Sequence, residues 1–446
     1  MTTTLTASTT AQLNQDIATA DAAASGGFII DLQGNITATG QLNAIDLQPG
    51  VSLTIDGSNG SGGVHTLNGA GSHGFLVNAG SVTIENLGLS NAVLAGGSSS
   101  ATVTLANDIF SRNVTIAHGL TVDEIAPVTF DSSTVTNQAG STYDVGVIGS
   151  AFVAGPVGVS RFINKGTLAQ TSLADAGSLG VSNIYVNVTD TGTLSVDGGS
   201  NLRFFGAHNS FSGTYVGAGM IDYWTGSINA LGTINMTNGA CTTVDGAIVN
   251  QNGVVTLSVN STITNYGTWN FTSNNGLALA DPSQPSSSGA AFTLYDALAK
   301  TGGTGTTVIG CDFNPNGGAG TIKVATGTLA FNGLVSNFYG AISGAGTLSN
   351  RRRWRRLDQR RHHHHYEGLD HCPVRHRRDL ERGAELFGLF QRTAGRHPDA
   401  DALERSDAEQ FGELCRGDRQ RLGRPDARRR PQGDNERRYG RRGRHH

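Results

Sequence analysis

The chain has no run of about 18 apolar residues, so the sequence predicts no membrane-spanning helix. Its 62 glycines follow no three-residue period, which excludes a collagen-like triple helix. No Cys-x-x-Cys pair or Cys/His cluster has zinc spacing, so Cys241 and Cys311 are expected to be isolated buried thiols. Residues 1–14 contain neither a basic side chain nor an apolar core, and we therefore expect no secretory signal peptide there.

Basic side chains are scarce in the first part of the chain and abundant in the last part. Residues 1–350 carry 19 acidic and six basic side chains, a net charge of −13. Residues 351–446 carry 26 Arg, no Lys and 16 acidic side chains, a net charge of +10. We therefore divide the chain into an N-terminal capping helix (1–27), a repeat domain (28–350) and an Arg-rich tail (351–446).

The first 27 residues have the pattern of one amphipathic helix. Hydroxyl groups at residues 8–10 can cap its start, and Ser25-Gly26-Gly27 can end it. Its apolar residues recur at i, i+4, i+7 and i+11 and so share one face: Leu13, Ile17, Ala20 and Ala24.

After this helix the apolar period changes from 3.6 to 2, in short segments such as residues 51–55 and 82–86. A unit of Gly-Thr followed by an apolar residue recurs, in four of its six intervals at 19 to 26 residues. The units begin at Gly166, Gly192, Gly213, Gly232, Gly267, Gly327 and Gly346. A period near 20 residues with short strands predicts a parallel β-solenoid of roughly 16 coils. An antiparallel β-sandwich array is the alternative, and the starting helix favours the solenoid because an open solenoid end needs a cover.

Several segments resemble a known family. Residues 11–14, 50–57 and 80–87 resemble the opening of bacterial autotransporter-type passenger domains, and residues 339–348 resemble the passenger-associated repeat of the same proteins. The resemblance implies a right-handed parallel β-helix that is displayed on a Gram-negative cell or secreted from it. The sequence departs from the family pattern because neither a signal peptide nor a translocator barrel is predicted.

The Arg-rich tail has two functional interpretations and one genetic one. Residues 351–356 could form a nucleic-acid patch, and residues 362–365 could bind metal or be a purification tag. Read one nucleotide later, however, each His or Asp codon becomes a Thr, Ile or Met codon, and each CGN Arg codon becomes one for Gly, Ala, Val, Asp or Glu. That frame has the Gly/Ser/Thr character of the preceding repeats. We therefore interpret residues 351–446 as an out-of-frame tail that is disordered or irregular, and expect an open edge after the last coil.

No catalytic or metal site is predicted. None of the six basic side chains before residue 351 lies beside an acid pair, and the one acidic doublet, Asp123-Glu124, is expected in an exposed turn. Four histidines fit surface or turn positions, namely His65, His73, His118 and His208. The isolated acids are expected at turns or strand ends, where Asp bonds its own backbone: Asp31, Asp56, Asp144, Asp197 and Asp245.

The aromatic residues Tyr223, Trp224, Tyr266 and Trp269 are the candidate site residues. On adjacent coils they could form a stripe on which carbohydrate stacks, and the alternative is that they cap the core at a corner. A rod held together by its own core needs no cofactor. We expect a structural or adhesive surface or secreted protein without catalytic activity.

Host or environmental glycans or proteins are the expected partners of this rod, and nucleic acid is not. The rod would be monomeric or would self-associate through its edges. The alternative functions are a carbohydrate-active β-helix enzyme and nucleic-acid binding through the tail. Three or more charged side chains from adjacent coils on a strand face would favour the enzyme, whereas a ladder of Thr or Asn would favour the structural role.

Overall fold

The computed structural model describes residues 1–350, apart from 99–100, 157, 172–179, 225–226, 238, 284–288, 317–319, 335–337 and 339. All of these described residues belong to the first of two units into which the chain divides, Met1–Cys372. The Arg-rich tail lies outside the described residues, and so do the interpretations of it.

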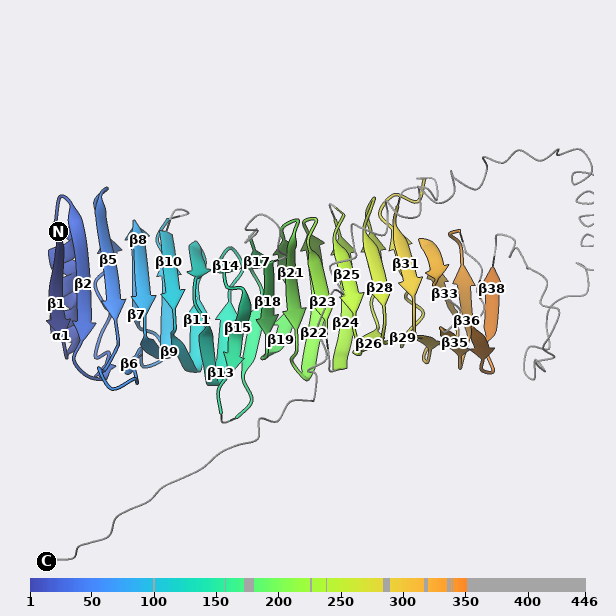
Figure 1. The fold of residues 1–446 in the computed structure, drawn as a ribbon, viewed down its shortest axis with the longest axis horizontal. Coiled ribbons are helices and arrows are strands. Elements are labelled where there is room, and N and C mark those ends of the chain that lie inside the picture. The colour runs from blue at the N-terminus through green and yellow to red at the C-terminus, as the bar shows by residue number, and fades with distance from the viewer. Residues whose placement is uncertain are drawn as a thin grey trace, which may run out of the picture. The chain divides into compact units, whose positions relative to one another are not determined.

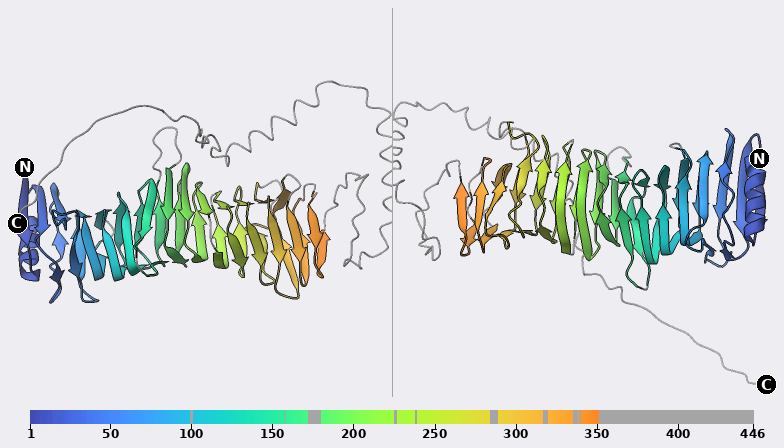
Figure 2. Two further views of the ribbon diagram at one scale, coloured as in Figure 1. Left: turned by 60° about the horizontal axis from the view of Figure 1, so that its bottom comes forward. Right: turned by 180° about the vertical axis from the view of Figure 1, so that it is seen from behind.

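The described residues form a parallel β-solenoid of about 15 turns, as the sequence predicts (Figure 1). Successive strands pair in three ladders, which we call faces 1, 2 and 3, and every pairing between strands is parallel. With strands about 4.8 Å apart, the stack is roughly 70 Å long. Figure 2 shows the same succession of turns from two other directions.

The strands are short, and most belong to a single face. Face 1 contains β1 (Thr2–Ala7), β2 (Gly26–Leu32), β5 (Val51–Asp56), β8 (Ser81–Glu85), β10 (Ala101–Ala106), β12 (Leu120–Glu124), β14 (Thr142–Val145), β17 (Thr167–Gln170), β20 (Thr193–Val196), β27 (Val255–Leu257), β30 (Leu277–Leu279), β33 (Thr306–Ile309), β36 (Thr328–Phe331) and β38 (Thr347–Asn350). Face 2 contains β3 (Ile36–Thr37), β6 (His65–Asn68), β15 (Gly149–Ala154), β18 (Gly180–Ile184), β21 (Ser200–Phe204), β23 (Met220–Tyr223), β25 (Cys241–Val244), β28 (Thr262–Asn265), β31 (Ala291–Leu294) and β34 (Asp312–Pro315). Face 3 contains β4 (Ile45–Asp46), β7 (Gly74–Ala79), β16 (Arg161–Asn164), β19 (Asn187–Asp190), β26 (Ile248–Gln251), β29 (Thr268–Phe271), β32 (Ala297–Lys300), β35 (Thr321–Val324) and β37 (Ala341–Ser343). Five longer strands turn a corner, from face 2 to face 3 in β9 (Leu87–Gly96), β11 (Ile109–Ile116) and β13 (Val128–Asn137), and from face 3 to face 1 in β22 (His208–Val216) and β24 (Ser227–Met236).

One helix, α1 (Thr10–Asp21), covers the first turn of the solenoid (Figure 1). The hydroxyl of Thr9 caps it by accepting a hydrogen bond from the backbone N–H of Gln12 at 3.2 Å. Its apolar face is buried, as expected for Leu13 and Ile17. The helix is shorter than the predicted 1–27, because Thr2–Ala7 forms β1, which pairs with β2.

The Gly-Thr repeat marks a corner of the solenoid. Gly166, Gly192 and Gly213 precede face 1 in three successive turns. A Cβ on Gly192 would lie 2.1 Å from the carbonyl oxygen of Gly166, and a Cβ on Gly213 would lie 2.2 Å from the carbonyl oxygen of Gly192. Only glycine fits there, and this close approach of successive turns explains why the unit recurs.

A ladder of buried polar side chains stands beside this corner. The Nδ2 of Asn137 donates to Oδ1 of Asn164 at 2.8 Å, and the Nδ2 of Asn164 donates to Oδ1 of Asp190 at 2.6 Å. The same two amide groups donate to the carbonyl oxygens of Thr167 and Thr193. The ladder therefore satisfies peptide groups at the turn, where strand pairing stops.

Further along the same edge of face 3, one lysine is buried. The ammonium group of Lys300 donates to the carbonyl oxygens of Ser273 at 3.1 Å and Gly302 at 2.7 Å, to Oγ1 of Thr307 at 2.9 Å and to Oδ1 of Asn274 at 3.3 Å. Burial lowers the pKa of Lys300, because no carboxylate balances its charge among these contacts.

Candidate binding surface

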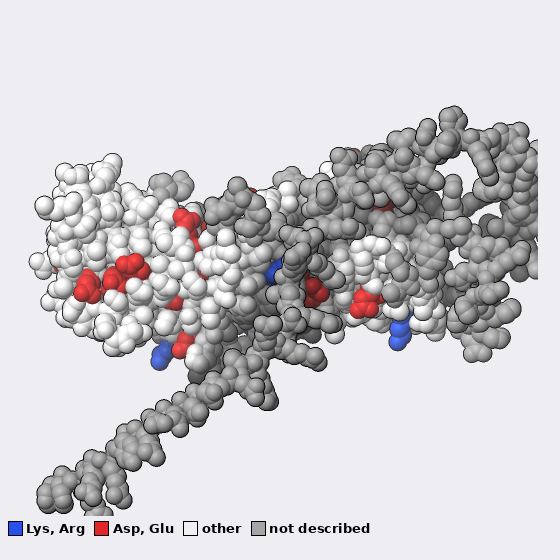
Figure 3. Space-filling view, viewed as in Figure 1, with Lys and Arg blue, Asp and Glu red and all other residues white. Residues whose placement is uncertain are grey.

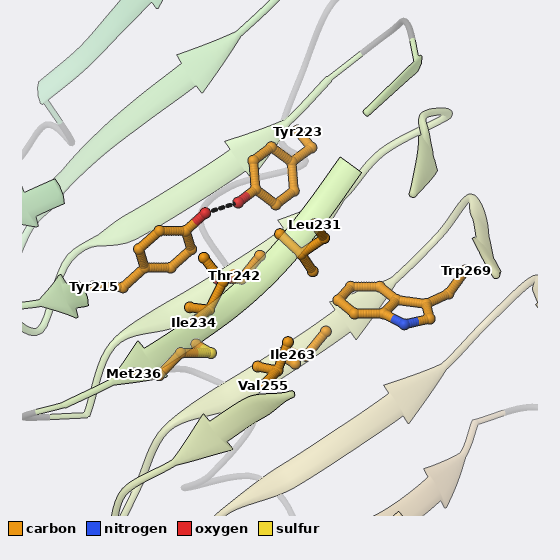
Figure 4. A pocket seen from close by; sticks show the side chains of 9 residues that line it. All are labelled: Tyr215, Tyr223, Leu231, Ile234, Met236, Thr242, Val255, Ile263 and Trp269. Atoms are coloured by element: carbon orange, nitrogen blue, oxygen red, sulfur yellow. Dashed lines mark hydrogen bonds between the residues drawn. The ribbon is translucent and has the colours of Figure 1, made fainter. Parts of the chain in front are cut away.

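Two of the four aromatic candidates belong to the core, which corrects the prediction for them. Tyr223 and Trp269 are each 1% exposed and line a small internal space (Figure 4). The hydroxyl groups of Tyr215 and Tyr223 are hydrogen-bonded to each other, and Nε1 of Trp269 donates to Oε1 of Gln251 at 2.9 Å. These side chains hold the solenoid together, and neither can stack on an external ligand.

The other two candidates, Trp224 and Tyr266, stand on the surface in one register. Each follows the last residue of a face 2 strand, and its backbone N–H bonds to the preceding turn: Trp224 to the carbonyl of Phe204, and Tyr266 to that of Val244. Seven successive turns place a residue at this position, at the corner between faces 2 and 3. We call this row the aromatic column: Tyr185, Phe205, Trp224, Asp245, Tyr266, Tyr295 and Asn316.

The rings of the aromatic column stack on one another in two groups. The ring centroids of Tyr185 and Phe205 are 4.8 Å apart, and those of Phe205 and Trp224 are 6.0 Å apart. In the second group, the centroids of Tyr266 and Tyr295 are 4.2 Å apart, with 23° between the ring planes. Asp245 occupies the turn between the two groups. The column is thus an aromatic stack with one ring missing.

Sequence reasoning missed three members of this column, Tyr185, Phe205 and Tyr295. A signal for them exists, because positions 185, 205, 224, 245 and 266 are separated by 19 to 21 residues, which is the period of the solenoid turns. A search for aromatic residues at that period would have selected the outward column. The choice by local clustering instead joined Tyr223 to its neighbour Trp224, and adjacent strand residues point to opposite faces.

Face 1 carries a second regular outward surface. Six successive turns place a threonine at one position, in the register of Thr121 with Thr142 and of Thr167 with Thr193. This threonine ladder consists of Thr102, Thr121, Thr142, Thr167, Thr193 and Thr214. Within the described part of the chain, none of the six hydroxyl groups is hydrogen-bonded to protein, so each is available to solvent or a partner.

Acidic side chains also face outward on adjacent turns of face 1, in two places. Asp56 pairs in register with Asp31 on one side and with Glu85 on the other. Asp123 pairs with Asp144, and burial together with the charge of Asp144 raises the pKa of Asp123. Three acids from consecutive turns are the arrangement that would favour an enzyme.

Most of these acids are also tied to their own surroundings. Asp56 accepts hydrogen bonds from the backbone and hydroxyl of Ser58, both at 2.9 Å. Asp144 accepts from the backbone N–H of Thr171 at 3.0 Å and from its hydroxyl at 2.9 Å. The expected role of isolated acids at turns and strand ends is confirmed for these two, since their carboxylates stabilise local backbone.

The acidic doublet was predicted wrongly as an exposed turn. Asp123 and Glu124 are in β12, and Glu124 is fully buried in the inward column of face 1, between Leu105 and Val145. Tyr143 donates a hydrogen bond from its hydroxyl to Oε2 of Glu124 at 2.9 Å. Burial raises the pKa of Glu124 to about 8, so the carboxyl group is mostly protonated at neutral pH.

Other titratable groups inside the solenoid are inert in the same way. Asp108 is fully buried and accepts hydrogen bonds from the backbone of Leu87 and Ala106, and its burial raises its pKa well above the usual value. Cys311 is a buried free thiol, as expected, and burial raises its pKa to about 12. Within the described residues, no group of three or more His, Cys, Asp or Glu side chains could hold a metal ion.

The remaining surface is sparsely charged. On the face that Figure 3 presents, a few acidic and basic side chains are separated by uncharged surface. Comparison with known proteins adds no identity to these features. No family model, curated protein or solved structure matches the chain. In the described part of the chain, no helix has the length and apolar character needed to span a bilayer.

Proposed function

We propose that this chain is a structural, adhesive rod that acts by binding and not by catalysis. The observation that carries the proposal is the regularity of its outward columns. The aromatic column and the threonine ladder each repeat one kind of side chain over successive turns. Repeated weak contacts along a rigid rod add up to firm attachment when the partner surface is itself extended.

The passenger-like identity is part of the same proposal. The resemblance of residues 11–14, 50–57, 80–87 and 339–348 to autotransporter-type passengers supports it, and a long solenoid with one capping helix is consistent with it. The rod would then act on a Gram-negative cell surface or after secretion, with glycans or proteins as partners. A shifted reading frame from residue 351 would continue the repeats.

Adhesion of coated beads tests the binding role. Beads that carry the full chain should adhere to host-cell or glycan-coated surfaces, and Trp224→Ser should reduce their adhesion. Ile125→Ser is the matched control, because Ile125 is 60% exposed but lies outside the aromatic column. Equal loss with both variants, or no adhesion by the unmodified chain, would contradict the proposal.

The coding DNA tests the passenger-like identity. Sequencing across codons 340–360 from an independent preparation should show that removing one nucleotide opens a frame of Gly/Thr-rich repeats. Early stop codons in the shifted frame would contradict it.

A carbohydrate-active enzyme is the second candidate, and the row of Asp31, Asp56 and Glu85 on consecutive turns favours it. Paired carboxylates can serve as the acid and base of glycoside hydrolysis. Incubation with acidic and neutral polysaccharides, followed by measurement of reducing ends and unsaturated products, decides between the candidates. Products that disappear with Asp56→Asn would establish the enzyme.

A further inference from the structure

The missing ring in the aromatic column has a defined size. Trp224 and Tyr266 lie two turns apart in the same register, which is two strand spacings, or about 9.6 Å. A flat group at the level of Asp245 would therefore lie about 4.8 Å from each ring. That distance is within the roughly 6 Å over which a cation is attracted to an aromatic face.

The sides of the two rings that face this gap are the inner sides of the two stacks. Phe205 and Arg203 both contact Trp224 from the preceding turn. Tyr295 contacts Tyr266 from the following turn. The turn of Asp245 lies between, and its side chain is half-buried at the same corner.

The adjacent turn shows which chemistry this kind of position holds. The guanidinium carbon of Arg203 lies 4.8 Å from the centre of the Trp224 ring, and Nε of Arg203 lies 3.3 Å from Oδ2 of Asp222. One indole face and one carboxylate thus bind one guanidinium group. On the other side of Trp224, Asp245 supplies a second carboxylate and Tyr266 a second ring.

Charge favours a cation in the gap. Residues 1–350 have a net charge of −13, and Arg203 offsets the charge of Asp222 but forms its salt bridge with that residue alone. Among the residues that the structure describes, Asp245 has no salt bridge. Asp245 also raises the pKa of Asp222 through its charge, which places the two carboxylates within electrostatic reach of each other.

We propose that the turn of Asp245 is a binding position for an arginine side chain of a partner protein, whose guanidinium group inserts between Trp224 and Tyr266 and pairs with Asp245. This inference rests on the proposed adhesive function and names the chemistry of its partner. A planar guanidinium suits a flat gap between two rings, whereas the compact, strongly hydrated ammonium group of lysine does not.

Fluorine NMR of the full chain labelled with fluorotryptophan tests the proposal. The chain has three tryptophans, and Trp269, which is 1% exposed, serves as an internal reference. The probe is acetyl-Gly-Arg-Gly-amide, titrated to large excess because residues 351–446 carry 26 arginines of their own. The Trp224 signal should shift saturably, and the Trp269 signal should stay in place.

Three variants and one isosteric peptide sharpen the test. Asp245→Asn and replacement of the arginine by citrulline should each weaken binding at least tenfold, since both remove the charge and keep the shape. Asp245→Tyr should abolish the shift without loss of thermal stability, because it supplies the missing ring. Asp296→Asn, which removes an exposed acid beside Tyr295, is the control and should leave binding unchanged.

Three results would overturn the inference: an unchanged Trp224 signal, equal binding of the citrulline peptide, or a saturable shift with methyl β-glucoside in place of the arginine peptide. Bead adhesion separates this failure from failure of the proposed function. Adhesion that depends on Trp224 but not on arginine would refute only the arginine partner. Absence of both would refute the two proposals together.

Discussion

Replacing Glu124 by glutamine should change how the stability of the solenoid depends on pH. The carboxyl group is fully buried between Leu105 and Val145, and its pKa is raised from 4.5 to about 8. The folded chain therefore holds a proton that the unfolded chain releases above pH 4.5. Stability from this group is greatest below pH 4.5, falls as the pH rises to about 8, and is constant above that.

The size of the effect follows from the shift of the pKa. Each unit corresponds to about 1.4 kcal/mol, so the penalty for an ionised Glu124 reaches on the order of 5 kcal/mol above pH 8. Glu124→Gln keeps the size of the side chain and an oxygen that can accept the hydrogen bond of Tyr143. It carries no charge at any pH. The variant should therefore match the unmodified chain at pH 4 and exceed it at pH 9.

Hydrogen exchange is the suitable assay, because solenoid turns can open locally and the chain need not unfold as one unit. Deuterium uptake is compared between the two proteins for peptides that cover β10, β12 and β14, at each pH from 4 to 9. Protection should be similar at pH 4 and higher in the variant at pH 9, by up to roughly a thousandfold. Glu85→Gln, at an outward glutamate, is the control. A difference that is the same at pH 4 and pH 9 would refute the reasoning.

Three further substitutions test the corners of the solenoid. Gly192→Ala should lower the free energy of unfolding by about 1–3 kcal/mol, because its Cβ would lie 2.1 Å from the carbonyl oxygen of Gly166, and denaturant unfolding should show no such loss for Gly34→Ala, where the space is open. Asn164→Ala should cost about 2–4 kcal/mol by breaking the buried ladder, and exchange should rise in the adjoining turns only; exchange that rises along the whole chain would contradict this. Lys300→Met should lower the thermal midpoint by several degrees, since it leaves four oxygen acceptors without their donor, and an unchanged midpoint would show that water replaces the ammonium group.

The architecture was predictable because it is periodic in the sequence. The glycine of each Gly-Thr unit is required by the approach of the previous turn, so the repeat of Gly166, Gly192 and Gly213 reports the length of a turn directly. The helix was predictable from Leu13 and Ile17, which share one buried face. The strand before it was missed because Thr2–Ala7 has one large apolar residue and little alternation.

The surface was harder to predict, because local composition does not say which way a side chain points. Trp269 alternates with Thr268 and Asn270 within β29, so it had to face the opposite side from them, and the structure places it inward. Tyr223 and Trp224 could not both face outward. Glu124 was unpredictable in a different sense, since a buried acid occupies a position that neighbouring turns fill with Leu105 and Val145.

The central claim is that the chain binds a partner through the aromatic column and leaves that partner unchanged. The most direct test exposes the full chain to a panel of immobilised proteins and glycans, and analyses every retained partner for chemical change. We predict that a partner is retained intact, and that Trp224→Ser loses it while Asp56→Asn does not. A partner that is shortened or modified in proportion to the protein present, or retention that survives Trp224→Ser, would contradict the account.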